Sequence, residues 1–156
     1  MTRGQGERSP TPAPARAESV AVDHPESNVV IVDGSNVAHS TEGEKPRIAN
    51  LIAVRDKLRE EGLDPIIMAD AALRHQIDDA AQYEQMVDSG AIRQVPAGTD
   101  ADYFILSFAR ELKATIVSND RFRDRLTQFP EARDRIIRFM IVNHEVVLER
   151  RTHRRD

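Results

Sequence analysis

The sequence contains no cysteine, no tryptophan and no long apolar run. Without cysteine, disulfide bonds and metal sites built from thiolates are excluded. Aromatic residues make up 4% of the chain, which argues against a platform of rings on which nucleic-acid bases stack. No apolar stretch approaches the roughly 20 residues that span a bilayer, and the N-terminal residues lack the apolar core of a secretory signal. We therefore expect a cytoplasmic protein without membrane segments.

An excess of positive charge is also absent. The 156 residues include 22 Lys and Arg against 26 Asp and Glu, so the formal net charge is -4. This balance argues against a protein that binds nucleic acid through its total charge, but it is compatible with a local basic patch beside an acidic site. The chain is 40% hydrophobic and is long enough to form one domain with a core.

The two ends of the chain differ in composition from its middle. Residues 1–27 are rich in Pro, Ala and Ser, as in SPTPAPARAES, and we predict a disordered tail there. Residues 28–150 are predicted to form the domain, and residues 151–156 a basic C-terminal tail. The stretch RRTHRR (150–155) is either a solvated end or a source of nonspecific affinity for phosphates.

Between the tails, short apolar runs alternate with amphipathic stretches. This alternation predicts an α/β fold, with a parallel sheet and helices on both of its faces. Helical spacing places Phe104, Ile105, Phe108 and Leu112 on a predicted core face. Strands are predicted at 29–33, 64–70, 91–96, 114–118 and 136–142, with a turn at Asn143 and His144 leading into EVVLE, and helices at 46–61, 78–89, 99–113 and 119–128.

Polar residues follow most of the predicted strands. In parallel sheets of this kind, ligands bind beyond the carboxyl ends of the strands, so residues at these ends are candidates for function. The candidates are Asp33, Asp70, the segment Ser118, Asn119 and Asp120, and, after the third strand, Asp100 and Asp102.

Several of these residues also have a structural explanation. Thr99 can cap the helix that follows it, with Asp102 in the place of a capping-box glutamate. Asn119 can cap the next predicted helix, and Asp70 can cap the segment after the second strand. Asp33 is harder to explain, because a carboxylate at the end of a buried strand needs a partner and none is close in the sequence.

Asp120 and Asp124 are four residues apart on a predicted helix, so their carboxylates are expected to share a face. Like charges at this spacing destabilise a solvated helix by a small amount. Either Arg121 and Arg125 neutralise the pair, or a bound cation does so. The sequence alone leaves both explanations open.

A cation becomes the better explanation if Asp33 and Asp102 lie near this pair. Four carboxylates in one place cannot all ionise without a counter-charge, and a set of oxygen ligands suits Mg²⁺ or Mn²⁺. A divalent ion in such a site can orient a water molecule and neutralise charge on a phosphodiester. Arg121 and Arg123 would then hold flanking phosphates. Asn36 would position the water, fix the Asp33 side chain, or form an Asx-type turn.

The segments VVIVDGSNVA and TDADYFILSFARELKATIVSNDRFRD resemble the NYN/PIN-like ribonucleases of the Regnase type. The likeness is closer to the small stand-alone prokaryotic members, and the zinc finger of the animal members is absent from this sequence. The resemblance implies a PIN-like three-layer α/β/α fold with a mainly parallel five-stranded sheet. It also implies Mg²⁺-dependent cleavage of RNA at an acidic pocket.

The resemblance also implies roles for individual residues. The aspartate and asparagine of the DGSN motif match Asp33 and Asn36. The two aspartates of SND-x-x-x-D match Asp120 and Asp124. Counting back from SND places the remaining acid at Asp102. The family often has a second acid directly before it; here Ala101 stands in that position, which leaves the role of Asp100 open. We expect the four aspartates to bind the metal, Asn36 to join them in catalysis, and the RNA to contact Ser35, Arg74, Ser118, Arg121 and Arg123.

The sequence therefore predicts a metal-dependent endoribonuclease. Two alternatives stay open: an RNA-binding or scaffold module with an idle pocket, and the nuclease toxin of a toxin–antitoxin pair. A phosphatase of the haloacid dehalogenase kind would need a second aspartate two residues after Asp33, where Ser35 stands. The sequence leaves open whether the chain forms a homodimer.

Overall fold

A computed structural model describes residues 27–41 and 45–149 of the chain. Apart from Ser27, the predicted N-terminal tail lies outside the described residues, and so does the basic stretch from Arg150 onward. Among the helices of the described part, none combines the length and the apolar character needed to cross a bilayer.

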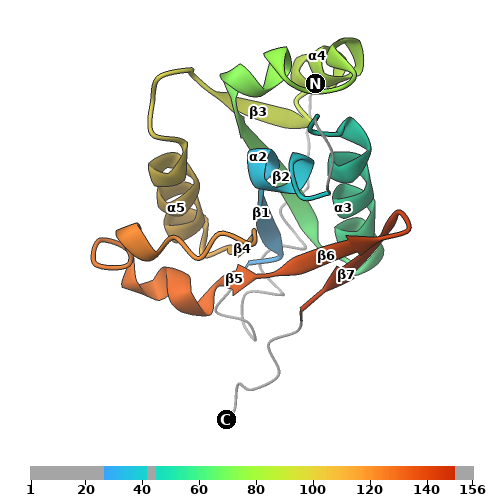
Figure 1. The fold of residues 1–156 in the computed structure, drawn as a ribbon. Coiled ribbons are helices and arrows are strands. Elements are labelled where there is room, and N and C mark those ends of the chain that lie inside the picture. Colours follow the sequence, from blue (N-terminus) through green and yellow to red (C-terminus); the bar gives the residue numbers. More distant parts are fainter. Residues whose placement is uncertain (1–26, 42–44, 150–156) are drawn as a thin grey trace, which may run out of the picture.

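The centre of the fold is a sheet of five parallel strands in the order β3-β2-β1-β4-β5 (Figure 1). This confirms the predicted α/β class and the parallel five-stranded sheet. The first strand in the chain lies in the middle, so its carboxyl end is flanked by those of two neighbours. The strands are β1 (Val29–Asp33), β2 (Asp64–Asp70), β3 (Ile92–Val95), β4 (Thr115–Val117) and β5 (Ile136–Ile137).

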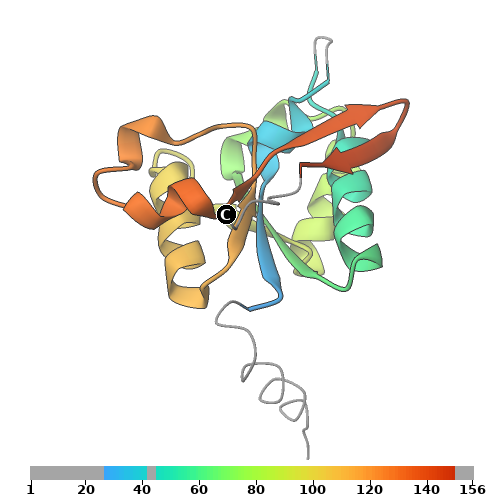
Figure 2. The same cartoon turned by 90° about the horizontal axis from the view of Figure 1, so that it is seen from below.

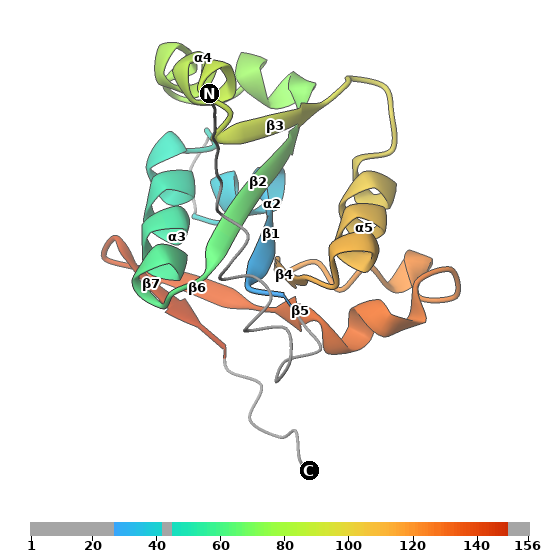
Figure 3. The same ribbon diagram turned by 180° about the vertical axis from the view of Figure 1, so that it is seen from behind.

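Helices cover both faces of the sheet and make three layers (Figures 2 and 3). Val30 and Val32 of β1 pack in one apolar cluster with α3 (Ile48–Glu60) and α4 (Ala80–Asp88). Ile31 packs in the other cluster with α5 (Ala101–Leu112). Side chains alternate along a strand, so Asp33, two residues after Ile31, lies on the α5 side of the sheet.

The helix predicted over 119–128 is wrong. The chain after β4 is a loop, followed by the single 3₁₀ turns η3 (Arg123–Arg125) and η4 (Pro130–Asp134). Phe122 has a left-handed backbone with φ of 51°, and its N–H donates to Asp120 Oδ1 at 2.7 Å. This local hydrogen bond gives the backbone an alternative to a helix.

The strand predicted over 136–142 is two strands. Only Ile136–Ile137 joins the parallel sheet, whereas β6 (Phe139–Val142) pairs antiparallel with β7 (Glu145–Leu148) across the predicted turn. The chain leaves the sheet because the Asn119 side chain bonds both backbone groups of Phe139, each at 3.0 Å. The hairpin lies against the face that α3 covers, where Val146 and Leu148 join the core (Figure 1).

Three further details differ from the prediction. The short helix α2 (Gly34–Ala38) and the 3₁₀ helix η2 (Ala71–His75) follow β1 and β2 directly. The prediction that Phe104 lies in the core is wrong, because its side chain is 42% exposed. Helix α5 buries the stripe Ile105, Leu106 and Ala109 instead.

Candidate functional site

Asp33 ends β1 and is buried, with 7% of its surface exposed. Its Oδ2 accepts a hydrogen bond of 2.9 Å from the Ser118 hydroxyl, and its Oδ1 accepts one of 3.4 Å from the Asn36 N–H. The second bond makes Asp33 the N-cap of α2. The expectation that no partner lies close in the sequence is therefore wrong, since Asn36 is three residues away.

Gly34 holds α2 directly against β2. A Cβ atom at this position would lie 2.8 Å from the Met68 carbonyl oxygen and 3.1 Å from the Ala69 Cβ. The first contact is closer than packed atoms tolerate and the second is tight, so a larger residue would push α2 and its cap away from the sheet. Glycine here lets the two elements approach closely.

Ser118 follows β4 and is fully buried. Its hydroxyl donates to Asp33 and accepts the Asp120 N–H at 3.0 Å. The predicted contact between Ser118 and RNA does not agree with this arrangement, because the side chain has no exposed surface and its hydroxyl is already bonded twice. Ser118 instead fixes the position of two aspartates relative to each other.

Asn36 links α2 to the loop after β4. Its Oδ1 accepts the Asn119 N–H at 2.9 Å. The Asn119 side chain in turn bonds the backbone of Phe139, so it caps no helix. Sequence reasoning missed this chain of contacts because its partners lie far apart in the sequence and form bonds that no local pattern signals.

A hollow of about 530 Å³ lies beside this loop, and we call it the acidic hollow after its three aspartates, although three arginines also line it. Arg121 and Arg123, which were predicted to contact RNA, lie in its wall with three of the four predicted metal ligands; the fourth, Asp33, lies outside the lining. The residues that line it are Asp102, Asn119, Asp120, Arg121, Phe122, Arg123, Asp124 and Arg125.

Negative charge is concentrated around this acidic hollow. Burial raises the pKa of the Asp33 carboxyl to about 6; the hydrogen bonds from Ser118 and Asn36 oppose this shift, and repulsion from Asp102 and Asp120 adds to it. Burial also raises the pKa of Asp102, and repulsion from Asp120 acts in the same direction. The three carboxylates therefore act on one another electrostatically, although they come from three separate segments.

Arginines do not neutralise these carboxylates in pairs. Within residues 27–41 and 45–149, Asp33, Asp102, Asp120 and Asp124 form no ion pair. Arg125, one of the two expected counter-charges, bonds Asp100 instead.

Asp100 and Asp70 have structural roles. Asp100, and not Thr99, caps α5 by accepting the Tyr103 N–H at 3.2 Å. Asp70 accepts the Ala72 N–H at 2.8 Å and caps η2. The capping role considered for Asp70 is therefore present.

The two remaining predicted RNA contacts lie outside the acidic hollow. Ser35 is half-buried in the first turn of α2. Arg74 lies in the last turn of η2 and forms an ion pair of 2.6 Å with Glu84, in which both side chains are partly exposed.

The donors around the acidic hollow suit a hard divalent cation, since all of the negatively charged ones are carboxylates. In the described part of the chain, however, no three carboxylate or imidazole groups come together as a ready ligand set. Mg²⁺ commonly keeps several water molecules and takes one or two protein carboxylates. The residues therefore fit a partly hydrated ion better than a closed cage.

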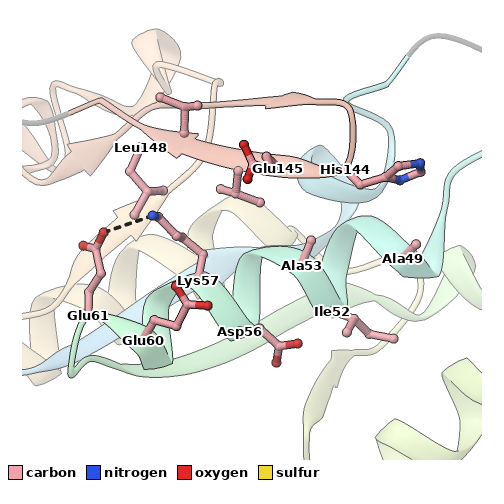
Figure 4. A pocket seen from close by; sticks show the side chains of 12 residues that line it. Ala49, Ile52, Ala53, Asp56, Lys57, Glu60, Glu61, His144, Glu145 and Leu148 are labelled. Atoms are coloured by element: carbon pink, nitrogen blue, oxygen red, sulfur yellow. Dashed lines mark ion pairs between the residues drawn. The ribbon is translucent and has the colours of Figure 1, made fainter.

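A second hollow, of about 740 Å³, lies between α3 and the β6–β7 hairpin (Figure 4). Lys57 and Glu61 form an ion pair of 3.7 Å in its wall. None of the predicted site residues lines it. This hollow is therefore separate from the predicted site.

Comparison with known proteins agrees with this fold. Two of the similar structures are described as nuclear proteinaceous RNase P 2 (PRORP2) from A. thaliana and Arabidopsis thaliana nuclear protein-only RNase P 2. They are 20% and 22% identical over 88% and 86% of this chain, with TM-scores of 0.65 and 0.64. The chain spans 32% of each of those longer chains, so the likeness concerns the fold of one part of them.

A search of curated proteins finds no match. Residues 26–156, however, match the family described as the Zc3h12a-like Ribonuclease NYN domain. The match covers the strand-end aspartates, the acidic hollow and the whole of the sheet. The chain therefore belongs to the Zc3h12a-like ribonuclease NYN domain family.

Proposed function

We propose that this domain is an endoribonuclease that depends on a divalent metal ion, Mg²⁺ or Mn²⁺. The observation that carries the proposal is the buried Asp33, whose pKa is raised by burial and by repulsion from Asp102 and Asp120. Concentrated negative charge without ion-pair partners favours a bound cation. The ribonuclease family of the chain supports RNA as the substrate, and so do the names of the RNase P neighbours.

Asp33, Asp102, Asp120 and Asp124 would surround the ion, with one or two of them bound to it directly and the others through its water molecules. When bound, a divalent ion supplies charge neutralisation on the phosphodiester and a lower pKa for water. The chain's own contribution is to hold the carboxylates in place, through the bonds from Ser118 to Asp33 and from Phe122 to Asp120. Fixed ligands reduce the reorganisation that the reaction would otherwise require.

The remaining residues would position the loop and the RNA. Asn36 keeps the loop after β4 against α2, so we assign it a positioning role. Arg121 and Arg123 lie in the wall of the acidic hollow, and we assign them to phosphates that flank the cleaved bond. Ser35 and Arg74 stay as predicted contacts at the ends of β1 and β2.

Incubation of purified protein with structured and unstructured RNAs tests the proposal. We expect internal cleavage with Mg²⁺ or Mn²⁺ that leaves 5′-phosphate ends, and no cleavage with EDTA. The ends are mapped by sequencing and by their sensitivity to phosphatase. Binding of RNA without cleavage across titrations of both metals would contradict the proposal and favour a non-catalytic RNA-binding module.

A further inference from the structure

A further cavity lies next to the acidic hollow, and four arginines line it. We call this cavity the arginine pocket. Its volume is about 560 Å³. It runs from the loop after β4 to the edge of the sheet formed by β5, and its residues come from three segments of the chain. They are Arg121, Arg123, Leu126, Arg133, Ile136, Arg138 and Glu149.

The arginine side chains outnumber the carboxylates in the lining of this pocket. Other arginines of the domain are paired, such as Arg74 with Glu84 and Arg110 with Glu131. Within residues 27–41 and 45–149, none of the four pocket arginines forms an ion pair, and Glu149 is the one carboxylate in the lining. Guanidinium groups stay charged at every physiological pH, so this cluster attracts an anion.

The chain as a whole carries a net charge of -4, so the arginine pocket is a local reversal of sign. Arg121 and Arg123 line both this pocket and the acidic hollow. A ligand that reaches from the acidic hollow into the arginine pocket would therefore leave a wall that mixes carboxylates with guanidiniums and enter one in which guanidiniums predominate. A phosphodiester strand carries one phosphate per nucleotide, so a strand with its reacting phosphate at the acidic hollow offers further phosphates to the arginine pocket.

The pocket also has an apolar part, formed by Leu126 and Ile136. Ile136 is buried in the cluster between the sheet and α5, and Leu126 packs against that cluster. A site for free inorganic phosphate needs no such surface. The apolar area suits the sugar or base of a nucleotide whose phosphates contact the guanidiniums.

We propose that the arginine pocket binds the backbone of a single RNA strand on one side of the bond that is cut. The strand's phosphates bond the guanidiniums, and one of its nucleosides covers Leu126 and Ile136. This proposal rests on the proposed ribonuclease function, because it assigns the reacting phosphate to the acidic hollow. Binding through the pocket fixes which internucleotide bond reaches the carboxylates.

The double variant Arg133→Gln/Arg138→Gln tests the proposal, since both residues line the arginine pocket and neither lines the acidic hollow. The readout is fluorescence anisotropy of a labelled single-stranded RNA of about ten nucleotides, measured in EDTA so that no cleavage occurs. We expect the affinity to fall at least about tenfold. The slope of log affinity against log salt should flatten by about 0.7 for each phosphate that the variant no longer neutralises.

Two matched variants separate the pocket from net charge and from misfolding. Arg59→Gln removes an exposed arginine from α3 and should leave affinity and salt slope unchanged. Arg133→Lys/Arg138→Lys keeps the charge but removes the two-pronged geometry, so it should recover part of the affinity. Circular dichroism melts check that each variant is folded.

The outcomes are distinguishable. An RNA affinity and a salt slope that stay unchanged in the double variant would overturn the pocket assignment, even if the wild type cleaves RNA. So would a loss of RNA affinity in Arg59→Gln as large as that in the double variant. Failure of the wild type to bind RNA in EDTA would also overturn it, as would adenosine 5′-monophosphate that binds as tightly as the RNA strand. Loss of binding in the double variant, with no cleavage by any form, would support the pocket and remove the nuclease function alone.

Discussion

The hydroxyl of Ser118 donates a hydrogen bond of 2.9 Å to Oδ2 of Asp33, although 85 residues separate the two in the sequence. The same hydroxyl accepts the N–H of Asp120. One buried side chain thus sets the position of a carboxylate at the end of β1 and of the segment that follows β4. The candidate site depends on this link between two neighbouring parallel strands.

Replacement of Ser118 by alanine removes both bonds at once. The buried Oδ2 of Asp33 and the N–H of Asp120 would each lose this partner, while the Asn36 N–H would still bond Asp33 Oδ1. We expect the free energy of unfolding to fall by about 2–3 kcal/mol at neutral pH. Urea denaturation measures this fall. Ser107→Ala in α5 is the control, since Ser107 is half-buried and makes no side-chain hydrogen bond to the described residues. An equal fall in both variants would contradict the role assigned to Ser118.

Gly34→Ala should destabilise the fold by about 1–3 kcal/mol, because the new Cβ would overlap the Met68 carbonyl of β2. Thermal unfolding measures the change. Ser35→Ala, one residue further along α2, should cost less than about 0.5 kcal/mol. Wild-type stability in Gly34→Ala would show that α2 can move without penalty.

Asp33 should make the metal-free protein less stable as the pH rises. The pKa of its carboxyl is about 6 in the folded state and 3.8 in the reference state, so the folded protein holds more protons between these values. The contribution of Asp33 to the free energy of unfolding therefore falls from about pH 4 to about pH 6 and stays low above it. In EDTA at pH 7.5, the free energy of unfolding of Asp33→Asn should exceed that of the wild type by up to about 3 kcal/mol.

The measurement is urea denaturation at a series of pH values, with the difference between the two proteins taken at each pH. Asp79→Asn serves as the control, since Asp79 is the exposed N-cap of α4 and is distant from Asp33 in the sequence. Its profile should follow that of the wild type. A difference between Asp33→Asn and the wild type that does not change with pH would contradict the prediction.

A divalent ion should reverse this effect. At a concentration a hundredfold above its dissociation constant, Mg²⁺ or Mn²⁺ would stabilise the wild type by about 2.7 kcal/mol. Asp33→Asn, Asp102→Asn and Asp120→Asn should each lose most of the increase in melting temperature. Differential scanning fluorimetry with each metal, and with EDTA added afterwards, makes the comparison. Equal metal-dependent shifts in all four proteins would place the ion elsewhere.

The strands that could be predicted from sequence are those with strong local signals. The bounds of β1 and β2 match the predicted 29–33 and 64–70, because each is an apolar run that ends at an aspartate. The strand predicted over 136–142 has the same apolar character, but Asn119 bonds Phe139 and removes β6 from the sheet. A contact across 20 residues leaves no local trace in the sequence.

The candidate site was predicted in part for a reason that the structure does not support. Asp120 and Asp124 line one hollow as expected, but they share no helix. Their convergence comes from the loop that Asn36 and Asn119 hold in place. The bonds made by Ser118 could not be predicted because they require knowledge of which strands are neighbours.

The measurement that tests the central claim most directly is RNA cleavage by Asp33→Asn in Mg²⁺ or Mn²⁺, beside the wild type and Asp79→Asn. We predict that the cleavage rate of Asp33→Asn falls at least about a hundredfold while the protein remains folded, because the substitution removes one of the carboxylates whose charge would hold the ion. Asp79→Asn should cleave like the wild type. Undiminished metal-dependent cleavage by purified Asp33→Asn would contradict the account.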